Sequence, residues 1–199
     1  MADAPSIPPL RCHAMTPRRW DDLAAVMGCR RDSDRCWCAY WRIASKDYRT
    51  GRNSGRNREV MRVLVDAGAP TGLIGYRGRT PVAWCGVAPR ADQERLARGR
   101  VLGPVDDVPV WSITCFVVPR PHRGTGLMRP MIAAAVDLAR RKGAPAVEAY
   151  PIDPLRAVGA GQIYTGLLQP FLDQGFREIA RRSPMRPIVR LDLTGRKRP

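Results

Sequence analysis

The sequence predicts one mixed α/β domain, with a central mixed sheet of about six to seven strands and helices on both faces. Two observations support this prediction. Short apolar runs rich in β-branched residues recur along the chain, and segments with helical spacing of apolar residues lie between them. Hydrophobic residues make up 44% of the 199 residues, which is enough for a core. We place the domain at residues 10–193, between an N-terminal extension (1–9) and a basic tail (194–199).

The first third of the chain predicts one strand and two helices. Leu10–Met15 is predicted as the strand, and a helix then runs from the N-cap residue Thr16 to about Met27. Ser45–Arg58 is polar and basic with Gly and Asn punctuation, which predicts a loop. Glu59–Ala67 has the amphipathic spacing of a short helix.

The middle of the chain predicts most of the sheet. Gly72–Tyr76 and Thr80–Ala88 flank a turn and indicate a β-hairpin. Pro89–Val108 is irregular, with a short helix expected at Asp92–Arg98. Val110–Val118 is the strongest strand signal, because it is β-branched and aromatic without an internal breaker.

The last third predicts two further helices and three strands. Thr125–Lys142 is the best helix, since its apolar residues recur at helical spacing. Ala146–Tyr150 is expected as a short buried strand, and Gln162–Gln174 as a helix. Phe176–Ala180 and Ile188–Leu193 are expected to close the chain as an antiparallel pair.

The net charge of +16 is carried almost entirely by arginine, since only three of the 34 basic residues are lysine. Such a charge suits an anionic partner, such as nucleic acid, a membrane surface or a polyphosphate ligand. The alternative explanation for this arginine-rich charge is the codon bias of a GC-rich genome, which replaces lysine by arginine. The arginines are spread along the whole chain rather than gathered in blocks, which favours the second explanation and argues against a nucleic-acid partner.

The expected location is the cytoplasm. No apolar run approaches the roughly 20 residues that a membrane helix needs, so no membrane partner is expected. The first residues lack the basic and apolar regions of a signal peptide. In that compartment the six cysteines are expected as free thiols.

A glycine-rich turn links the strongest strand to the strongest helix. Gly124 and Gly126 allow a ligand to approach the backbone closely, and the helix start after them favours a phosphate group. Arg120 and Arg123 add charged donors. A P-loop is excluded because its Gly-Lys-Ser/Thr ending is absent, and a dinucleotide fingerprint because the third glycine is missing.

This stretch resembles the CoA-binding motif of the GNAT N-acetyltransferase superfamily. The family strand ends V-x-P, matched by Val117-Val118-Pro119, and its [QR]-x-x-G-x-[GA] motif is matched by the arginine and glycine of Arg123–Met128. The match departs at Met128, where the family prefers Gly or Ala, and the loop is one residue longer. A second family landmark, a short strand followed by aromatic-x-x-x-Gly-Phe, is matched by Val147–Ala149 and Phe171–Phe176.

The resemblance implies acetyl-CoA as co-substrate, with no metal, and it implies which residues hold the cofactor. The pantetheine arm would lie along the backbone of Phe116, Val117 and Val118. The pyrophosphate would lie on Arg123, Gly124, Thr125, Gly126, Leu127 and Met128, with Arg129 as an additional phosphate contact.

The catalytic groups that the resemblance implies are partly absent. The family's usual acid is a tyrosine at the position of Phe171, and its frequent glutamate would fall near Trp111, so neither residue can transfer a proton. The nearest candidates are the hydroxyls of Tyr164 and Tyr150 and the carboxylate of Glu148, with Asp153 as a further carboxylate. A strand N–H between Phe116 and Val118 is the candidate oxyanion donor.

An aromatic cluster suggests a place for the acyl acceptor. Trp37, Tyr40 and Trp41 follow the first helix at helical spacing, which is ordinarily a core pattern. In GNAT-like folds, however, this segment covers the acceptor pocket, where aromatic walls suit an amine through cation–π contact.

The cysteines offer two further hypotheses. Cys29, Cys36 and Cys38, with Cys12 or His13, could form a zinc site, although Cys-x-Cys spacing is a poor chelate and buried thiols are the default. Cys115 on the central strand could carry an acyl group, but no histidine is placed by the sequence to activate it.

The leading hypothesis is transfer of an acetyl group from acetyl-CoA to a primary amine of a small molecule or peptide by direct attack. One alternative is a regulatory module that binds CoA without turnover, supported by Phe171 in place of tyrosine. Another is a basic nucleic-acid-binding protein. A homodimer is left open.

Overall fold

The computed structural model describes residues 8–154, 159 and 161–194. Most of the expected N-terminal extension and the basic tail after residue 194 therefore lie outside the described residues.

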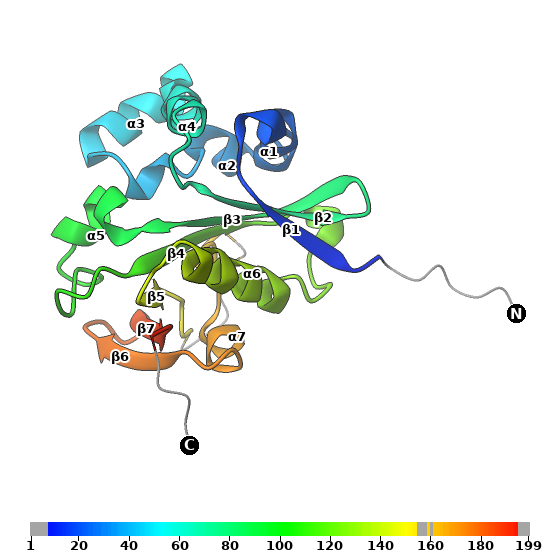
Figure 1. The fold of residues 1–199 in the computed structure, drawn as a ribbon. Helices are drawn as coiled ribbons and strands as arrows, with labels where there is room; N and C mark the ends of the chain where they lie inside the picture. Colours follow the sequence, from blue (N-terminus) through cyan, green and yellow to red (C-terminus); the bar gives the residue numbers. More distant parts are fainter. Residues whose placement is uncertain (1–7, 155–158, 160, 195–199) are drawn as a thin grey trace, which may run out of the picture.

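The described chain forms one seven-stranded mixed sheet, which confirms the predicted fold class (Figure 1). The strand order is β1-β2-β3-β4-β5-β7-β6, and every neighbouring pair is antiparallel except β4–β5. The strands are β1 (Leu10–Ala14), β2 (Gly72–Arg77), β3 (Thr80–Pro89), β4 (Trp111–Val117), β5 (Ala146–Ala149), β6 (Arg177–Arg181) and β7 (Pro187–Asp192).

Helices cover both faces of this sheet (Figure 1). On one face lie α1 (Trp20–Met27), α2 (Arg31–Cys36), α3 (Ser45–Ser54) and α4 (Arg56–Asp66). On the other lie α6 (Met128–Arg141) and α7 (Leu168–Leu172), and α5 (Glu94–Arg98) follows β3.

Two apolar layers follow from this arrangement, one on each face of the central strands. Met131, Ile132 and Ala135 of α6 pack in the first layer, while Trp20 and Leu23 of α1 pack in the second. The central strands β4 and β5 are buried along almost their whole length, which explains why their sequences are continuous apolar runs rather than alternating ones.

The predicted loop at Ser45–Arg58 is wrong, because this segment forms α3 and the start of α4. The break between the two helices is a single residue, Gly55, at φ +80°. Asn57 is buried and its amide donates to the backbone oxygens of Arg35 and Tyr48. Tertiary hydrogen bonds of this kind stabilise helices whose polar sequence carries no apolar period.

Two predicted helices begin later than their sequence patterns indicate. The helix expected from Thr125 begins at Met128, because Gly124 and Gly126 adopt left-handed φ values of +70° and +77°. The helix expected at Gln162–Gln174 shortens to α7, and the residues before it form turns with Gly166 at φ +89°.

Candidate functional site

The sheet opens at the carboxyl end of β4. The parallel pairing with β5 covers only Trp111–Ile113 against Val147–Ala149, so the last four residues of β4 continue without β5 beside them. The pairing with β3 also shifts here, since Gly86 faces Cys115 while Val87 faces Ile113. Thr114 is thus the extra residue of a bulge, a feature that re-aims neighbouring groups.

A cavity of about 620 Å³ lies at this opening. Its wall includes Phe116, Val117 and Val118 of the β4 end and the glycine-rich turn that follows. At its other end it is lined by Cys36, Cys38, Cys115, Tyr40, Tyr48 and Tyr164, a set that we call the thiol–tyrosine chamber. One cavity therefore joins the predicted phosphate turn to a chamber of polarisable and aromatic side chains.

The glycine-rich turn is braced by hydrogen bonds from its own side chains. Arg123 Nε donates to the backbone oxygen of Val118 at 2.9 Å, and Thr125 Oγ1 donates to that of His122 at 2.7 Å. Arg77 of β2 donates to the backbone oxygen of Thr125 at 3.1 Å. The turn leads directly into the N-terminus of α6, whose unpaired N–H groups and dipole favour an anion. This geometry suits a phosphate group, as the sequence predicts.

Most predicted cofactor residues lie on this cavity. Phe116, Val117, Val118, Arg123, Gly124, Gly126, Leu127 and Met128 line it. Arg129 instead forms a surface ion pair with Asp173, in which Nε donates to Oδ2 at 2.9 Å, so its guanidinium is engaged away from the cavity.

The backbone of Phe116 is already engaged. Its N–H donates to the backbone oxygen of Tyr164 at 2.6 Å, so the turn before α7 occupies the side of β4 that β5 has left. Within the described part of the chain, the Val118 N–H donates no hydrogen bond. Among the N–H groups expected between Phe116 and Val118, Phe116 is engaged by Tyr164 and Val117 pairs with Trp84 of β3. Val118 is therefore the available donor in this conformation.

Tyr164 is the one predicted catalytic residue that the fold brings to the chamber. Its ring lies edge-on to Tyr40 with 6.4 Å between centroids. Burial, followed by the nearby Tyr40 hydroxyl, raises the pKa of Tyr164 above its ordinary value. The phenol thus stays protonated at neutral pH and is a proton donor rather than a base.

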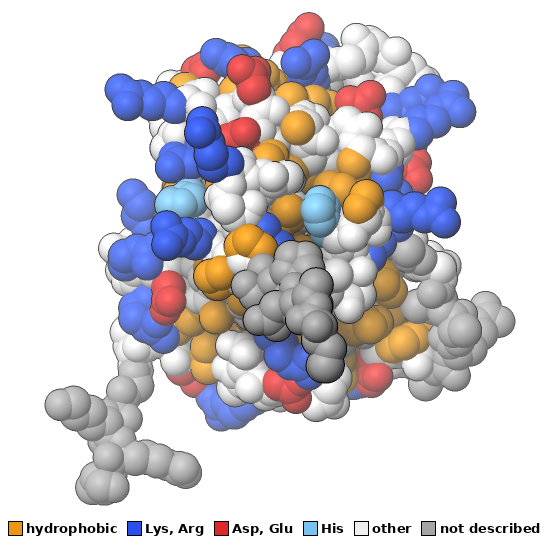
Figure 2. Space-filling model, turned by 90° about the vertical axis from the view of Figure 1, so that its right-hand side faces the viewer, with side chains coloured by type: hydrophobic (Ala, Val, Ile, Leu, Met, Phe, Trp, Pro, Cys, Tyr) orange, Lys and Arg blue, Asp and Glu red, His pale blue; other side chains and the backbone are white. Residues whose placement is uncertain are grey.

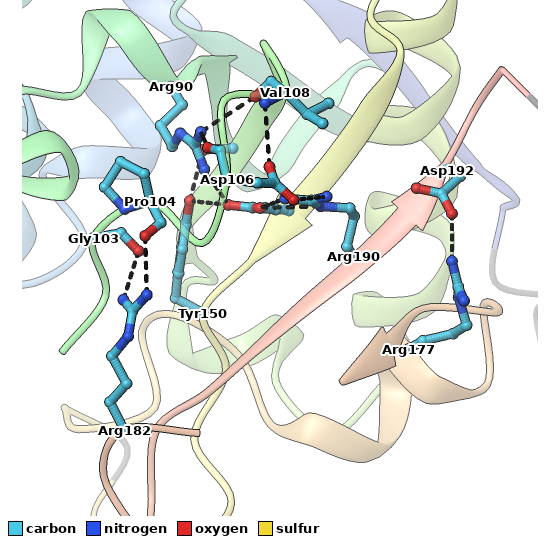
Figure 3. Close-up of polar contacts among 12 residues, drawn as sticks. Arg90, Gly103, Pro104, Asp106, Val108, Tyr150, Arg177, Arg182, Arg190 and Asp192 are labelled. Atoms are coloured by element: carbon cyan, nitrogen blue, oxygen red, sulfur yellow. Dashed lines mark hydrogen bonds and ion pairs between the residues drawn. The ribbon is translucent and has the colours of Figure 1, made fainter. Parts of the chain in front are cut away.

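Glu148 and Tyr150 lie instead in a buried ionic network with Arg90 and Arg190. Figure 3 shows Tyr150, Arg90 and Arg190 of this network. Glu148 accepts from Arg90 at 3.0 Å and from Arg190 at 2.6 Å, and Arg190 also pairs with Asp106. The Tyr150 hydroxyl donates to Glu148 at 3.0 Å. Neither residue lines the cavity, and both oxygens of the Glu148 carboxylate accept hydrogen bonds from guanidinium groups.

The aromatic cluster is divided by the fold. Only Tyr40 lines the cavity. Trp37 stacks on Trp20 with 5.2 Å between centroids, and Trp41 is buried and donates from Nε1 to the backbone oxygen of Thr114 at 3.1 Å. The sequence pattern does not separate these roles, because Trp37 and Cys38 adopt left-handed φ values of +46° and +47°, which no helical spacing anticipates.

Several lining residues were not identified from the sequence. They include Met27, Arg30, Asp32, Ser33, Tyr48 and Ile163, of which Asp32 and Ser33 come from α2 and Tyr48 from α3. Asp32 is the one acidic side chain among the described lining residues, and it lies 3.5 Å from Arg52. The segment predicted as a loop carries Tyr48 and Arg52, and no motif indicated either.

Neither a membrane span nor a metal cluster is found in the described residues. No helix there is long and apolar enough to cross a bilayer. No three His, Cys, Asp or Glu side chains of that part of the chain gather closely enough to hold a metal ion. Cys12 of the suggested zinc set contacts Met131 in the α6 layer, whereas Cys38 belongs to the α1 layer.

On the face drawn in Figure 2, Lys and Arg side chains lie mostly around the periphery, with apolar surface exposed toward the middle. This face carries no continuous basic stripe of the kind that binds nucleic acid.

The sequence also matches a family model, described as the acetyltransferase (GNAT) family, over residues 21–157. The chain belongs to the GNAT acetyltransferase family. It is therefore an acyltransferase by class. No curated protein has a sequence that matches this chain significantly.

Solved structures of GNAT proteins share this fold at low sequence identity. Salmonella typhimurium yncA, solved with acetyl-CoA, is 15% identical, with 96% of this chain and 97% of that one covered and a TM-score of 0.51. A Listeria monocytogenes GNAT acetyltransferase is 13% identical, with 92% and 95% covered and a TM-score of 0.55. The Thermoplasma acidophilum paia N-acetyltransferase, in complex with coenzyme A, is 9% identical, with 92% and 99% covered and a TM-score of 0.51.

At the two positions where the GNAT pattern carries its usual acid and glutamate, this chain has buried aromatic residues. Phe171 is fully buried, between Phe116 and Phe176 at centroid distances of 6.2 and 5.3 Å. Trp111 is also buried, at the start of β4. Each ring fills a core site, so the family's acid and glutamate are replaced here by packing groups.

Proposed function

We propose that the chain transfers an acetyl group from acetyl-CoA to a primary amine. The observation that carries this proposal is the single cavity that runs from the phosphate turn at Gly124 and Gly126 to the thiol–tyrosine chamber. A phosphate site at one end and an enclosed chamber at the other suit a long thioester with a diphosphate. CoA or acetyl-CoA is present in the Thermoplasma and Salmonella structures that share the fold.

Three groups are assigned to the reaction. The acceptor amine attacks the thioester carbonyl, and the Val118 N–H is the donor for the oxyanion that develops. Tyr164, kept protonated by burial, gives its proton to the leaving thiolate of CoA, and the proton that the amine nitrogen loses returns to the phenol through water. Asp32 at the cavity wall attracts an alkylammonium acceptor, and the Tyr40 and Tyr48 rings add cation–π contact.

Calorimetric titration with acetyl-CoA and an assay for thiol release with a panel of primary amines test this function. We expect saturable binding and release of CoA with at least one primary amine, and none with matched tertiary amines. Asp32→Asn should raise the KM for that amine while the Kd for acetyl-CoA stays the same, because the carboxylate belongs to the acceptor end. Absence of acetyl-CoA binding would refute the proposal.

A regulatory role is the second candidate, and the burial of Phe171 where the family has a tyrosine favours it. Such a module binds acetyl-CoA without turnover. The same assay separates the two functions, since binding without thiol release across the amine panel supports the regulatory module.

A further inference from the structure

Three cysteine thiols line the chamber and have no part in the reaction described above. Cys36 ends α2, Cys38 follows it in the left-handed region, and Cys115 comes from β4, next to Phe116. Segments far apart in the sequence thus bring three sulfur atoms to the lining of one cavity.

The surroundings of Cys38 favour its thiolate form. Trp84 Nε1, a group that can only donate, gives its hydrogen bond to Cys38 Sγ at 3.1 Å. Arg42 lies close enough for its charge to act on Cys38, and it donates to the carbonyls of Pro70 and Thr71 rather than to a carboxylate. These carbonyl contacts leave its positive charge in place, and Cys38 and the Asp92 carboxylate are the negative groups that act on it.

Cys38 and Cys115 are driven in opposite directions. The neighbouring Cys115 thiol, together with Trp84 and the charge of Arg42, lowers the pKa of Cys38 although burial opposes the change. The neighbouring Cys38, followed by burial, raises the pKa of Cys115 well above its ordinary value. Burial also raises the pKa of Cys36. The Trp84 hydrogen bond and these neighbours thus favour Cys38 as the nucleophilic thiol of the chamber, while Cys115 and Cys36 stay protonated.

We propose that Cys38 carries the acetyl group as a covalent thioester before an amine receives it. This inference deepens the proposed function and rests on it. Cys38 Sγ attacks the acetyl carbonyl carbon, a bond forms between Sγ and that carbon, and the bond from the carbon to the CoA sulfur breaks. The proton that Cys38 has lost ends on the CoA sulfur, so one thioester and one thiol are exchanged for another pair without an oxidant or metal.

The second half of the cycle restores the enzyme. The acceptor amine attacks acetyl-Cys38, an amide forms, and Cys38 leaves as the thiolate that Trp84 and Arg42 stabilise. The proton that the amine nitrogen loses passes to water and replaces the one that left with CoA. This route supplies a nucleophile in a site whose expected acid and glutamate positions hold Phe171 and Trp111.

Label exchange in the absence of any amine tests the intermediate directly. The enzyme is incubated with unlabelled acetyl-CoA and deuterium-labelled CoA, and mass spectrometry follows label into acetyl-CoA. An acetyl-enzyme catalyses this exchange, whereas direct transfer to an amine does not. We expect exchange with the wild-type chain and its loss in Cys38→Ser. No exchange by the wild type, or undiminished exchange by the serine variant, overturns the proposal.

Cys29→Ser is the matched control, because Cys29 is exposed and does not line the cavity, so its exchange rate should equal that of the wild type. Thermal unfolding and the Kd for acetyl-CoA show whether Cys38→Ser keeps its fold and binding. A readout that needs no variant is acid-quenched wild-type enzyme digested with trypsin. The Cys36–Arg42 peptide should carry a hydroxylamine-sensitive acetyl group that fragmentation assigns to Cys38, and assignment to Cys36 contradicts the proposal.

Failure of this inference differs from failure of the proposed function. If amines are acetylated but no exchange occurs and Cys38→Ser keeps its kcat, transfer is direct and only the acyl-cysteine is wrong. If acetyl-CoA does not bind, or binds and no amine is acetylated, the proposed function itself fails.

Discussion

The two ends of the cavity differ in how they are built. The phosphate end is made from one continuous stretch of β4, the glycine-rich turn and α6, and backbone groups supply its chemistry. The thiol–tyrosine chamber is assembled from α2, α3, β4 and the turn before α7, and side chains supply its chemistry. Phosphate binding by backbone groups tolerates many substitutions of the surrounding side chains. The acceptor specificity of the chamber depends on side chains, so a few substitutions can change it.

The largest effect that separates the two ends is expected from Tyr164→Phe. Loss of a general acid should lower kcat by on the order of 10²–10⁴-fold, while the Kd for acetyl-CoA stays the same. Steady-state kinetics and calorimetry give the two quantities. Tyr76→Phe is the control, because it removes a hydroxyl that bonds Asp22 away from the cavity. A Tyr164→Phe enzyme with unchanged kcat would show that water protonates the thiolate.

Glu148→Ala should affect neither end of the cavity but should destabilise the fold. Removing the carboxylate leaves Arg90 and Arg190 buried beside each other without their shared partner, which costs about 3–5 kcal/mol in the free energy of unfolding. Urea denaturation measures this loss. If Glu148 were instead a catalytic base, kcat would fall while the stability of the variant stayed close to that of the wild type.

Gly126→Ala should weaken acetyl-CoA binding at the phosphate end, with a smaller effect in free energy than the two substitutions above. A Cβ meets nothing within 4 Å there, so the penalty comes from φ +77° alone, roughly 1–2 kcal/mol. If the turn relieves this strain by changing shape, the Kd for acetyl-CoA rises by about 5–30-fold. Gly78→Ala is the matched control, since Gly78 has φ +59° and an equally open site in the β2–β3 turn. It should lose similar stability and keep its affinity.

The smallest effect is expected from Arg129→Ala. Arg129 is exposed and paired with Asp173, and surface ion pairs contribute about 0–1 kcal/mol. Calorimetry should therefore find an almost unchanged Kd for acetyl-CoA. A tenfold weaker Kd would instead place Arg129 on a phosphate of the cofactor and extend the phosphate end beyond the cavity lining.

This difference between the two ends also decides how much of the site could be predicted from the sequence. The β4–turn–α6 unit is local, so its β-branched run, its glycines and its apolar spacing predicted both its fold and its phosphate chemistry. The surroundings of Glu148, by contrast, could not be predicted from local sequence, because no charged residue close to it along the chain indicates that it forms an ion pair. Its partners Arg90 and Arg190 lie far away along the chain, and only the fold brings them to it.

The chamber was harder to predict for two physical reasons. The helix α3 has no apolar period, and its burial of Tyr48 depends on contacts with α4. The left-handed backbone at Trp37 and Cys38 turns one aromatic ring into the core and a thiol into the cavity. Neither effect leaves a signal in local sequence, because both are imposed by tertiary packing.

The hydrogen bond from Phe116 N–H to the Tyr164 oxygen has a kinetic consequence. If the pantetheine arm takes this N–H, the turn that holds Tyr164 must first release it, so cofactor entry includes a conformational step. In stopped-flow experiments the observed association rate should then level off at high acetyl-CoA concentration instead of rising linearly. Because Tyr164 is also the proposed proton donor, release of this hydrogen bond on acetyl-CoA binding would change the position of the Tyr164 side chain. Cofactor binding would therefore position the general acid.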